Sequence, residues 1–154
     1  MTDAQVLFNE NSTELALDNH TQTLQYIQDA VIPNMLGPLD VSIDHYLKVN
    51  KNNNIKKSVR RTLRSLSDSA STLCIYSYGK HIQKLLSILQ ITSARLPKGT
   101  KLQQWNKLSS FTQIKHKHGN ELIDDKITIP IFITVVTTGD AQLDPLYSAK
   151  FTKQ

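Results

Sequence analysis

Apolar and polar positions along the chain predict a leading helix followed by alternating strands and helices. The clearest helical pattern is Ile55–Leu66, whose apolar residues fall in one narrow stripe when each residue is turned by about 100°. Short β-branched and aromatic runs, bounded by glycine, proline or asparagine, predict the strands. The leading helix begins at Asn19 or Thr21 and is ended by Pro33, Gly37 and Pro38. The other expected elements are a strand over Val41–Val49, a helix over Ile55–Leu66, a strand over Thr72–Tyr78, a helix over Lys80–Ala94, and strands over Gln103–Ile114 and Ile127–Thr137.

This order predicts a mixed α/β fold, an α+β two-layer β-α-β-α-β-β unit with an extra N-terminal helix. Strands that alternate with helices imply right-handed crossovers and at least one parallel pair, whereas the last two strands form a hairpin with a long charged loop. Pro130 lies inside the last strand, where it cannot donate to a neighbour, so we expect a bulge or an unpaired side there. Residues 1–18 lack strong periodicity and predict a mobile acidic lead. The chain divides into an acidic extension over residues 1–40 and a domain over residues 41–154.

Charge is separated along the sequence. The 154-residue chain has a net charge of +5, but residues 1–44 hold seven acids and no Lys or Arg, whereas residues 45–120 hold fifteen Lys or Arg and one acid, Asp68. Clustered cations with so few local carboxylates favour a polyanionic partner, because bound cations release the counterions condensed on phosphates. A merely solvated basic surface is the alternative. A membrane surface is disfavoured because no Trp/Phe/Leu-rich interfacial helix supports the cations.

The predicted helix over Ile55–Leu66 carries its cations on one face, and no acid lies three or four residues away to pair with them. Like charges at this spacing destabilise a helix by about 0.2–0.5 kcal/mol per pair, so phosphate contact is the simplest compensating gain. An ordinary solvated face is the alternative. Asn54 is a candidate N-cap, and the helix start beside Lys51 is a candidate anion site because its N–H groups have no helical acceptor. The cations of this face are Lys56, Lys57, Arg60, Arg61 and Arg64.

The turn at Gly79 is a second candidate anion site. A strand ends at Tyr78, where the tyrosine is a candidate exposed aromatic, glycine lets the backbone approach a ligand, and Lys80 and His81 begin the next helix. The turn is not a phosphate-binding Walker motif, because the long glycine loop and the Lys-Ser/Thr pair are missing.

Trp105 and the loop after residue 114 are further candidates for nucleic-acid contact. Trp105 has Lys101 and Lys107 nearby and could stack on an unpaired base, or it could serve as a core or dimer contact. The segment Lys115–Gly119 has the composition of a basic finger suited to a groove or a run of phosphates. His116 and His118 make a poor metal site, because no Cys, Asp or Glu joins them at ligand spacing.

Several classes of protein are excluded by composition. Cys74 is the only cysteine, which rules out an intramolecular disulfide framework and a Cys-rich zinc module and fits a reducing compartment. No stretch approaches the ~20 apolar residues needed to cross a bilayer. Catalysis by this chain is also disfavoured, because Asp124 and Asp125 are its only adjacent carboxylates and no acid is evident to orient a Ser/His pair. We expect a small soluble intracellular domain without cofactor or metal.

The order of elements and several sequence blocks resemble the Alba superfamily of nucleic-acid-binding proteins. The resemblance is closer to one branch, the fungal Alba-like protein subunit of nuclear RNase P and RNase MRP. The blocks at Gly79 and Trp105 are the specific ones, and together the blocks span roughly residue 50 to the end. They are Asn54–Val59, Ser77–Leu89, Gln104–Phe111, Asn120–Leu122 and Phe151–Gln154.

The resemblance implies an Alba-like β-α-β-α-β-β fold and a non-catalytic role. Such subunits pair with a second Alba-like protein, in a heterodimer that binds the RNA subdomain called paired region three, alongside other RNase P/MRP proteins. The RNA cleaves the tRNA 5′ leader and ribosomal-RNA precursors, in the nucleus and nucleolus, and telomerase RNA is a plausible additional ligand. Ile91 and outward residues of the last two strands are candidates for the dimer surface. The alternatives are an Alba-type protein that coats duplex DNA in chromatin and, less favoured, a stand-alone RNA-processing enzyme.

The residues expected to contact RNA come from the basic helix and its start, the Gly79 turn, the Trp105 strand and the basic finger. They are Lys51, Asn54, Lys56, Lys57, Arg60, Arg61, Arg64, Tyr78, Gly79, Lys80, His81, Lys84, Trp105, Lys107, Lys115 and Lys117.

Overall fold

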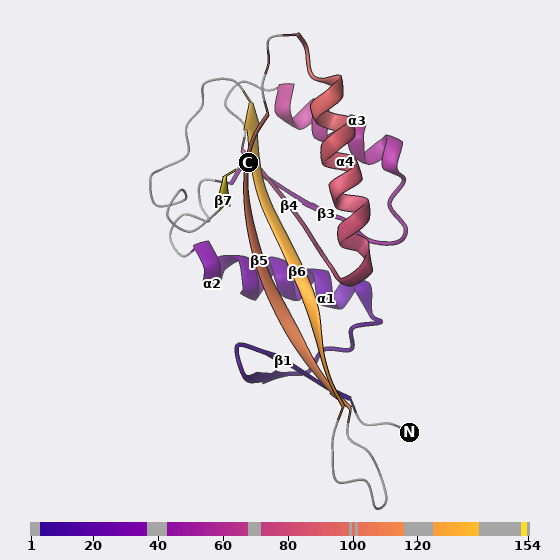
Figure 1. Cartoon of the computed structure of the whole chain (residues 1–154), viewed down its shortest axis with the longest axis vertical. Coiled ribbons are helices and arrows are strands. Elements are labelled where there is room, and N and C mark those ends of the chain that lie inside the picture. The colour runs from indigo at the N-terminus through magenta and orange to yellow at the C-terminus, as the bar shows by residue number, and fades with distance from the viewer. Residues whose placement is uncertain are drawn as a thin grey trace, which may run out of the picture.

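The computed structural model describes residues 4–36, 43–67, 72–98, 100, 102–115, 125–138 and 152–153, and Figure 1 shows their arrangement. Within these ranges, none of the helices has the length and apolar character needed to cross a membrane. The strands are β1 (Ala4–Phe8), β2 (Asn11–Thr13), β3 (His45–Lys48), β4 (Leu73–Tyr78), β5 (Leu102–Lys115), β6 (Asp125–Thr138) and β7 (Thr152–Lys153). The helices are α1 (His20–Tyr26), the π-helical turn η1 (Ile27–Val31), α2 (Ile32–Leu36), α3 (Ile55–Ser67), the 3₁₀ turn η3 (Gly79–His81) and α4 (Ile82–Arg95).

The strands form one mixed sheet in the order β2-β1-β5-β6-β4-β3, and β7 also pairs with β5. β3 and β4 are parallel and α3 connects them, whereas the other pairs are antiparallel. β5 and β6 stay in register from Leu102↔Thr138 to Lys115↔Asp125. The predicted α/β class, the β-α-β-α-β-β order, the parallel pair and the closing hairpin are confirmed.

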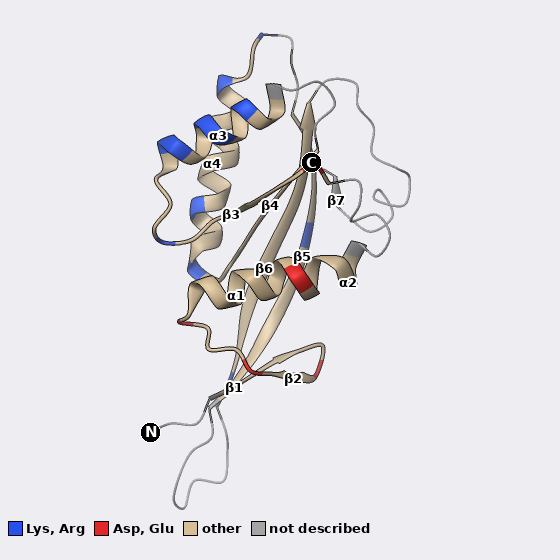
Figure 2. Cartoon of the chain, turned by 180° about the vertical axis from the view of Figure 1, so that it is seen from behind, with Lys and Arg blue, Asp and Glu red and all other residues tan. Residues whose placement is uncertain are grey.

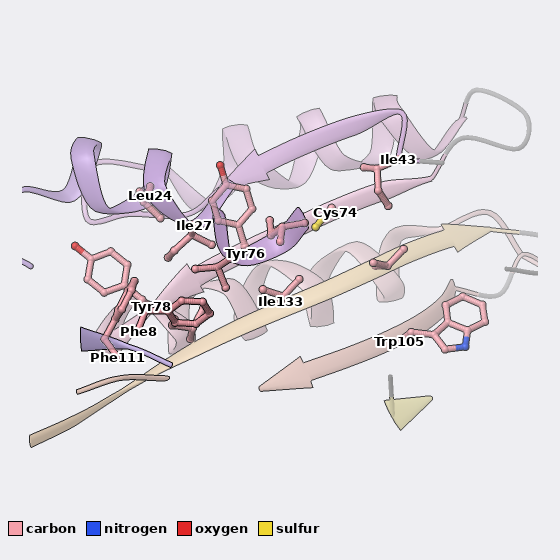
Figure 3. Close-up of a cluster of buried hydrophobic side chains, with 14 of the residues drawn as sticks. Phe8, Leu24, Ile27, Ile43, Cys74, Tyr76, Tyr78, Trp105, Phe111 and Ile133 are labelled. Atoms are coloured by element: carbon pink, nitrogen blue, oxygen red, sulfur yellow. The ribbon is translucent and has the colours of Figure 1, made fainter. Parts of the chain in front are cut away.

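Helices cover both faces of the sheet, and β4 lies between them with all six residues buried. Its Leu73 and Ile75 pack under α3 and α4 with Val59 and Leu85. Its alternate residues Cys74, Tyr76 and Tyr78 point to the other face, where α1 and η1 contribute Leu24, Ile27 and Val31; Figure 3 shows this second cluster. The N-terminal helix therefore adds a layer on the side of the sheet opposite α3 and α4.

A partly buried hydrogen bond also ties the N-terminal helix to β4. The Tyr76 hydroxyl donates to Oε1 of Gln28 in η1 at 2.8 Å. Burial, with smaller contributions from Cys74 and Asp29, raises the pKa of Tyr76. The Tyr76 hydroxyl therefore stays protonated over the physiological pH range and keeps its proton for the hydrogen bond to Gln28.

The prediction of a mobile lead over residues 1–18 was wrong for its first part. β1 adds to the edge of β5 from Ala4↔Lys115 to Leu7↔Thr112, and β2 folds back on β1. Their two-residue turn places Asn9 and Glu10 at positive φ (51° and 65°), a conformation that Asn-Gly signals more clearly than Asn-Glu does.

Of the three residues expected to end the leading helix, Pro33 does not, because the helix continues to Leu36, one residue before Gly37. A proline ring clashes with the carbonyl four residues earlier in an α-helix. Here the turn before it is π-helical, and the N–H of Ile32 bonds to Ile27 O, five residues back. This wider turn accommodates the ring. The domain boundary predicted between residues 40 and 41 lies outside the described residues.

Pro130 has the unpaired side that the sequence predicted. It is opposite Ser110 in a register that continues without a bulge. On the other side of β6, β4 ends at Tyr78, which is opposite Ile131. The missing N–H of Pro130 therefore disrupts no pairing with β4.

We predict that Leu24→Ala destabilises the whole chain. Leu24 is fully buried between α1 and the sheet, so the truncation should lower the free energy of unfolding by about 2–5 kcal/mol. Urea unfolding followed by circular dichroism and by the fluorescence of the single tryptophan should shift together. The exposed Gln22→Ala variant of the same helix should stay within about 0.5 kcal/mol. A helical signal that melts well before the tryptophan signal would contradict a shared core.

Candidate nucleic-acid interface

The cations of α3 lie on one exposed face, as predicted. Val59, Thr62 and Leu66 hold the helix on the sheet, while the five predicted cations are exposed. Figure 2 shows Lys and Arg gathered along α3 and the start of α4, whereas Asp and Glu lie along the N-terminal segment on the other side. Among the described carboxylates, none pairs with Lys56, Lys57, Arg60 or Arg61. The described part of the acidic lead therefore leaves this face open.

The loop that starts α3 is held in shape by its own asparagines. Asn53 Oδ1 accepts a hydrogen bond from the Asn50 N–H at 2.8 Å, and Asn50 Oδ1 accepts one from the Asn52 N–H at 2.9 Å. Asn54 Oδ1 accepts the Lys57 N–H at 3.3 Å, which confirms Asn54 as the N-cap. The exposed Lys51 therefore extends from a loop that is already ordered.

Lys84 anchors this loop to α4. Its ammonium donates to the carbonyls of Asn50, Lys51 and Asn53 at 3.0, 3.0 and 2.9 Å. An ammonium has three N–H donors, so all of them have a protein acceptor. The sequence placed Lys84 among the RNA contacts, and the structure corrects this to a positioning role, because the side chain fixes the segment that carries Lys51.

The Gly79 turn lies beside the same loop, because Lys84 follows Lys80 by about one helical turn. Gly79 has φ +61°, and an added Cβ would meet only Ile129 Cγ2 at 3.7 Å. The glycine is therefore needed for its backbone conformation and not for lack of space. Lys80 is exposed next to it. The β3–α3 loop, the start of α3 and the Gly79 turn together form one basic surface.

Tyr78 is not exposed at the end of its strand, and this expectation was wrong. Only 4% of it is accessible. Its hydroxyl donates to Leu17 O at 2.7 Å and lies 2.7 Å from Nδ1 of His20. The single hydroxyl proton is used on Leu17, so the His20 Nδ1–H donates to the tyrosine oxygen. The N-terminal segment covers Tyr78, which leaves no face for a base.

His81 is likewise buried, with 7% of it accessible, and this argues against direct phosphate contact. Its ring packs edge-on against His20 with centroids 4.9 Å apart. The pKa of His81 is lowered mainly by burial. Smaller contributions, in decreasing order, come from the charges of His20, Lys80, Lys84 and Lys51. A neutral imidazole results near pH 7. Lys80 is therefore the residue of this turn that is exposed on the basic surface, and His81 packs beneath the turn.

Trp105 belongs to the core, and its assignment to base stacking is corrected. It is 3% accessible and packs in the cluster that α1 and η1 cover. Lys107 shares its face, because strand residues two apart point the same way. That face lies across the sheet from α3. Lys107 is therefore not part of the α3 surface.

The basic finger is only partly described. Lys115 ends β5 opposite Asp125, and its side chain is outside the description. Lys117, His116 and His118 lie outside the described residues. Their expected contact with RNA stays a prediction.

Two large apolar side chains, one on α4 and one on β5, are exposed. Leu108 of β5 is 69% accessible and Leu86 of α4 is 46% accessible. A groove of about 400 Å³ lies between Leu86, Leu89 and Gln104. Leu108 is opposite Phe132 on the face of the sheet that carries α3 and α4. The helices thus leave the β5 end of this face uncovered.

Comparison with known proteins identifies the family. The sequence pattern of Alba matches residues 45–112, which run from β3 to most of β5. The chain is also 38% identical to the "Ribonucleases P/MRP protein subunit POP6" of Saccharomyces cerevisiae, over 97% of this chain and 98% of that protein. The chain belongs to the Alba family, in the branch of this subunit. The resemblance expected from the Gly79 and Trp105 blocks is therefore confirmed.

A solved Alba structure shows a weaker likeness. Alba from Thermoplasma volcanium has a TM-score of 0.43 and 16% identity, and it covers 60% of this chain and 98% of its own. The match of the Alba pattern itself begins at β3. The N-terminal strands and helix therefore lie outside the matched region.

Sequence reasoning missed three elements of this site. His20 beneath the Gly79 turn gave no signal, because its contact with Tyr78 joins residues 58 apart. The hydrogen bonds between Asn50 and Asn53 did have a signal, the run of asparagines, because asparagine side chains commonly bond to neighbouring backbone in turns. Leu86 gave no signal of exposure, because a helical leucine is usually buried.

We predict that Lys84→Met loosens the start of α3. The variant keeps the length of the side chain but loses the donors to three carbonyls, so the free energy of unfolding should fall by about 1–3 kcal/mol. Urea titration measures this loss, and faster hydrogen exchange at the Asn52 and Asn53 amides should accompany it. Lys80→Met, on the exposed side of the turn, is the matched control and should change stability by about 0.5 kcal/mol or less. Equal effects of both variants would show that Lys84 does not anchor the loop.

Proposed function

We propose that this protein is a non-catalytic RNA-binding subunit of RNase P and RNase MRP. The observation that carries the proposal is the open cationic face of α3, joined to an ordered basic loop, in a chain that matches an RNase P/MRP subunit over nearly its whole length. In this role it stabilises the RNA that performs tRNA 5′ maturation and ribosomal-RNA precursor processing. The corresponding location is the nucleus and nucleolus.

The α3 surface suits the sugar–phosphate backbone of folded RNA. Cations at i, i+3 and i+4 on a helix lie about 5–6 Å apart, so several of them can face neighbouring phosphates at once. The first N–H groups of α3 add a partial positive charge at the same end. A-form major grooves are too narrow for side chains to read. Sequence preference therefore comes from an internal loop of the RNA, in the subdomain called paired region three.

Two exposed leucines and the groove beside α4 support pairing with a second Alba-like subunit. Leu86 and Leu108 are large apolar side chains that water reaches, and the groove between α4 and β5 can receive side chains from a partner. We infer that the groove and the two leucines belong to one protein contact. The resulting heterodimer clamps the RNA with two basic surfaces, and telomerase RNA is a further candidate ligand.

We predict that Lys56→Glu with Arg60→Glu removes RNA binding and leaves the fold intact. Both side chains are exposed, so circular dichroism and thermal unfolding should stay close to the parent protein. Affinity for an internal-loop RNA, measured by fluorescence anisotropy near 0.15 M salt, should fall by at least about 100-fold, because two phosphate contacts become repulsive. The slope of log affinity against log salt should become smaller by about one per lost contact.

The matched control reverses two exposed lysines that are not part of α3, Lys98→Glu with Lys126→Glu. It changes net charge by the same amount and should lower affinity much less. Equal losses in the two double variants would show a diffuse charge effect and would reject the α3 surface. In competition at fixed salt, duplex DNA that displaces the RNA equally well would support the chromatin-type alternative instead.

We predict that Leu86→Asp with Leu108→Asp prevents heterodimer formation. Each change places a carboxylate in an apolar contact, where burial without a partner is unfavourable. Co-expression with the second Alba-like subunit, followed by light scattering, should give a complex for the parent and separate chains for the variant. Ile127→Asp, an exposed isoleucine on the same hairpin that faces the other side of the sheet, should still form the complex. A complex that survives the double change would place the interface elsewhere.

A further inference from the structure

The N-terminal layer carries an open groove that the RNA-binding role does not use. It has a volume of about 780 Å³ and lies between the link after β2 and one face of α1 and η1. We propose that this acidic groove binds an extended, Lys/Arg-rich segment of another protein component of the same particle. The choice of a particle component rests on the proposed function, whereas the chemistry of the groove does not. Its lining residues are Ser12, Thr13, Glu14, Leu15, Asn19, Thr21, Gln22, Gln25, Tyr26 and Asp29.

The length of the groove fits a short extended peptide. Its helical wall runs from Thr21 to Asp29, which spans roughly 12 Å at 1.5 Å per residue. An extended chain rises about 3.3 Å per residue, so about four residues of a partner lie along this wall. The volume lies inside the roughly 300–1,000 Å³ of known ligand sites.

The charge of the groove selects a cationic occupant. Glu14 and Asp29 are its charged lining residues, and both are exposed. The chain has no Lys or Arg before Lys48, so no cation from this segment opposes them. One oxygen of Asp29 accepts a hydrogen bond from Gln25 Nε2 at 2.9 Å, which orients the carboxylate along the helix. A phosphate backbone is repelled here, and among the described residues no group of three His, Cys, Asp or Glu could hold a metal ion.

The apolar lining gives such a segment something to pack against. Leu15 and Tyr26 are half-buried, so part of each remains accessible in the groove. The Tyr26 ring packs on Phe8 and Phe111, with centroids 6.3 and 6.1 Å away. The core therefore fixes its position before a partner arrives. An arginine or lysine that stacks on a tyrosine face gains a cation–π contact beside its ion pair.

The groove lies mainly across the sheet from the α3 cations, and only its Asn19–Thr21 end, beside His20, comes near the Gly79 turn. α1 and η1 cover one face of the sheet, and α3 and α4 cover the other. A basic protein segment and the RNA can therefore bind at the same time, because none of the groove residues belongs to the α3 surface.

The test measures the binding of a defined peptide to the full-length protein. The probe is a fluorescent octapeptide that alternates lysine and leucine, with a glutamate–leucine peptide as its control, at about 0.15 M salt. Glu14→Gln with Asp29→Asn should weaken lysine–leucine binding by about five- to tenfold, which is the size expected for two exposed ion pairs. Glu10→Gln with Asp18→Asn removes the same charge just outside the groove and should change affinity by less than about twofold.

Any of the following results would overturn the groove proposal. The first is no binding of the lysine–leucine peptide, or equal weakening by the two double variants. The second is displacement of the peptide by a short RNA, which would assign the groove to nucleic acid. The third is stronger peptide binding by Lys115→Gln with Lys117→Gln, which would show that the chain's own basic loop fills the groove. RNA affinity of the same proteins is a separate readout, so the RNA function and the groove can fail independently.

Discussion

The burial of β4 from both sides is the constraint on which the other features depend. Each of its six residues is enclosed, and alternate side chains enter two different clusters. A strand of this kind needs helices on both faces, so α3 and α4 alone cannot complete the fold. The acidic segment at the N-terminus therefore supplies part of the core, and its charges stay on the outer surface of the layer it forms.

This arrangement separates charge in space as well as in sequence. The cations of α3 stand on one side of the sheet and the described carboxylates of the N-terminal segment on the other (Figure 2). The positive electrostatic field of the α3 cations is then not cancelled by nearby carboxylates. Exposed charges farther apart than a Debye length, about 8–10 Å, are largely screened from each other by salt. The two proposed interactions, with RNA on one face and with a cationic protein segment on the other, both depend on this separation.

The helices and strands of the Alba region could be predicted because their signals are local. The stripe of Val59, Leu63 and Leu66 and the cap at Asn54 each lie within one helix. The N-terminal hairpin could not be predicted, because β1 is defined by its pairing with β5 and only Val6 and Phe8 mark its buried face.

At the candidate site, the sequence predicted less than it did for the fold. Exposure of the α3 cations followed from their position opposite the apolar stripe. The burial of Tyr78 did not, since its hydroxyl acceptor is 61 residues away in the chain. The role of Lys84 was hidden for the same reason, because its acceptors are backbone carbonyls that precede it by 31 to 34 residues. Residue type and spacing indicated which side chains carry charge, but not which of them have their donors already occupied.

The asparagine loop held by Lys84 has a consequence for how quickly the protein finds its ligand. A segment that folds only on contact loses conformational freedom at that moment, at about 1–2 kcal/mol for each backbone residue fixed. Here that loss belongs to the folding of the protein. Encounter with a polyanion is then a docking of rigid bodies, guided by long-range attraction, and its rate depends on ionic strength more than on rearrangement of the loop.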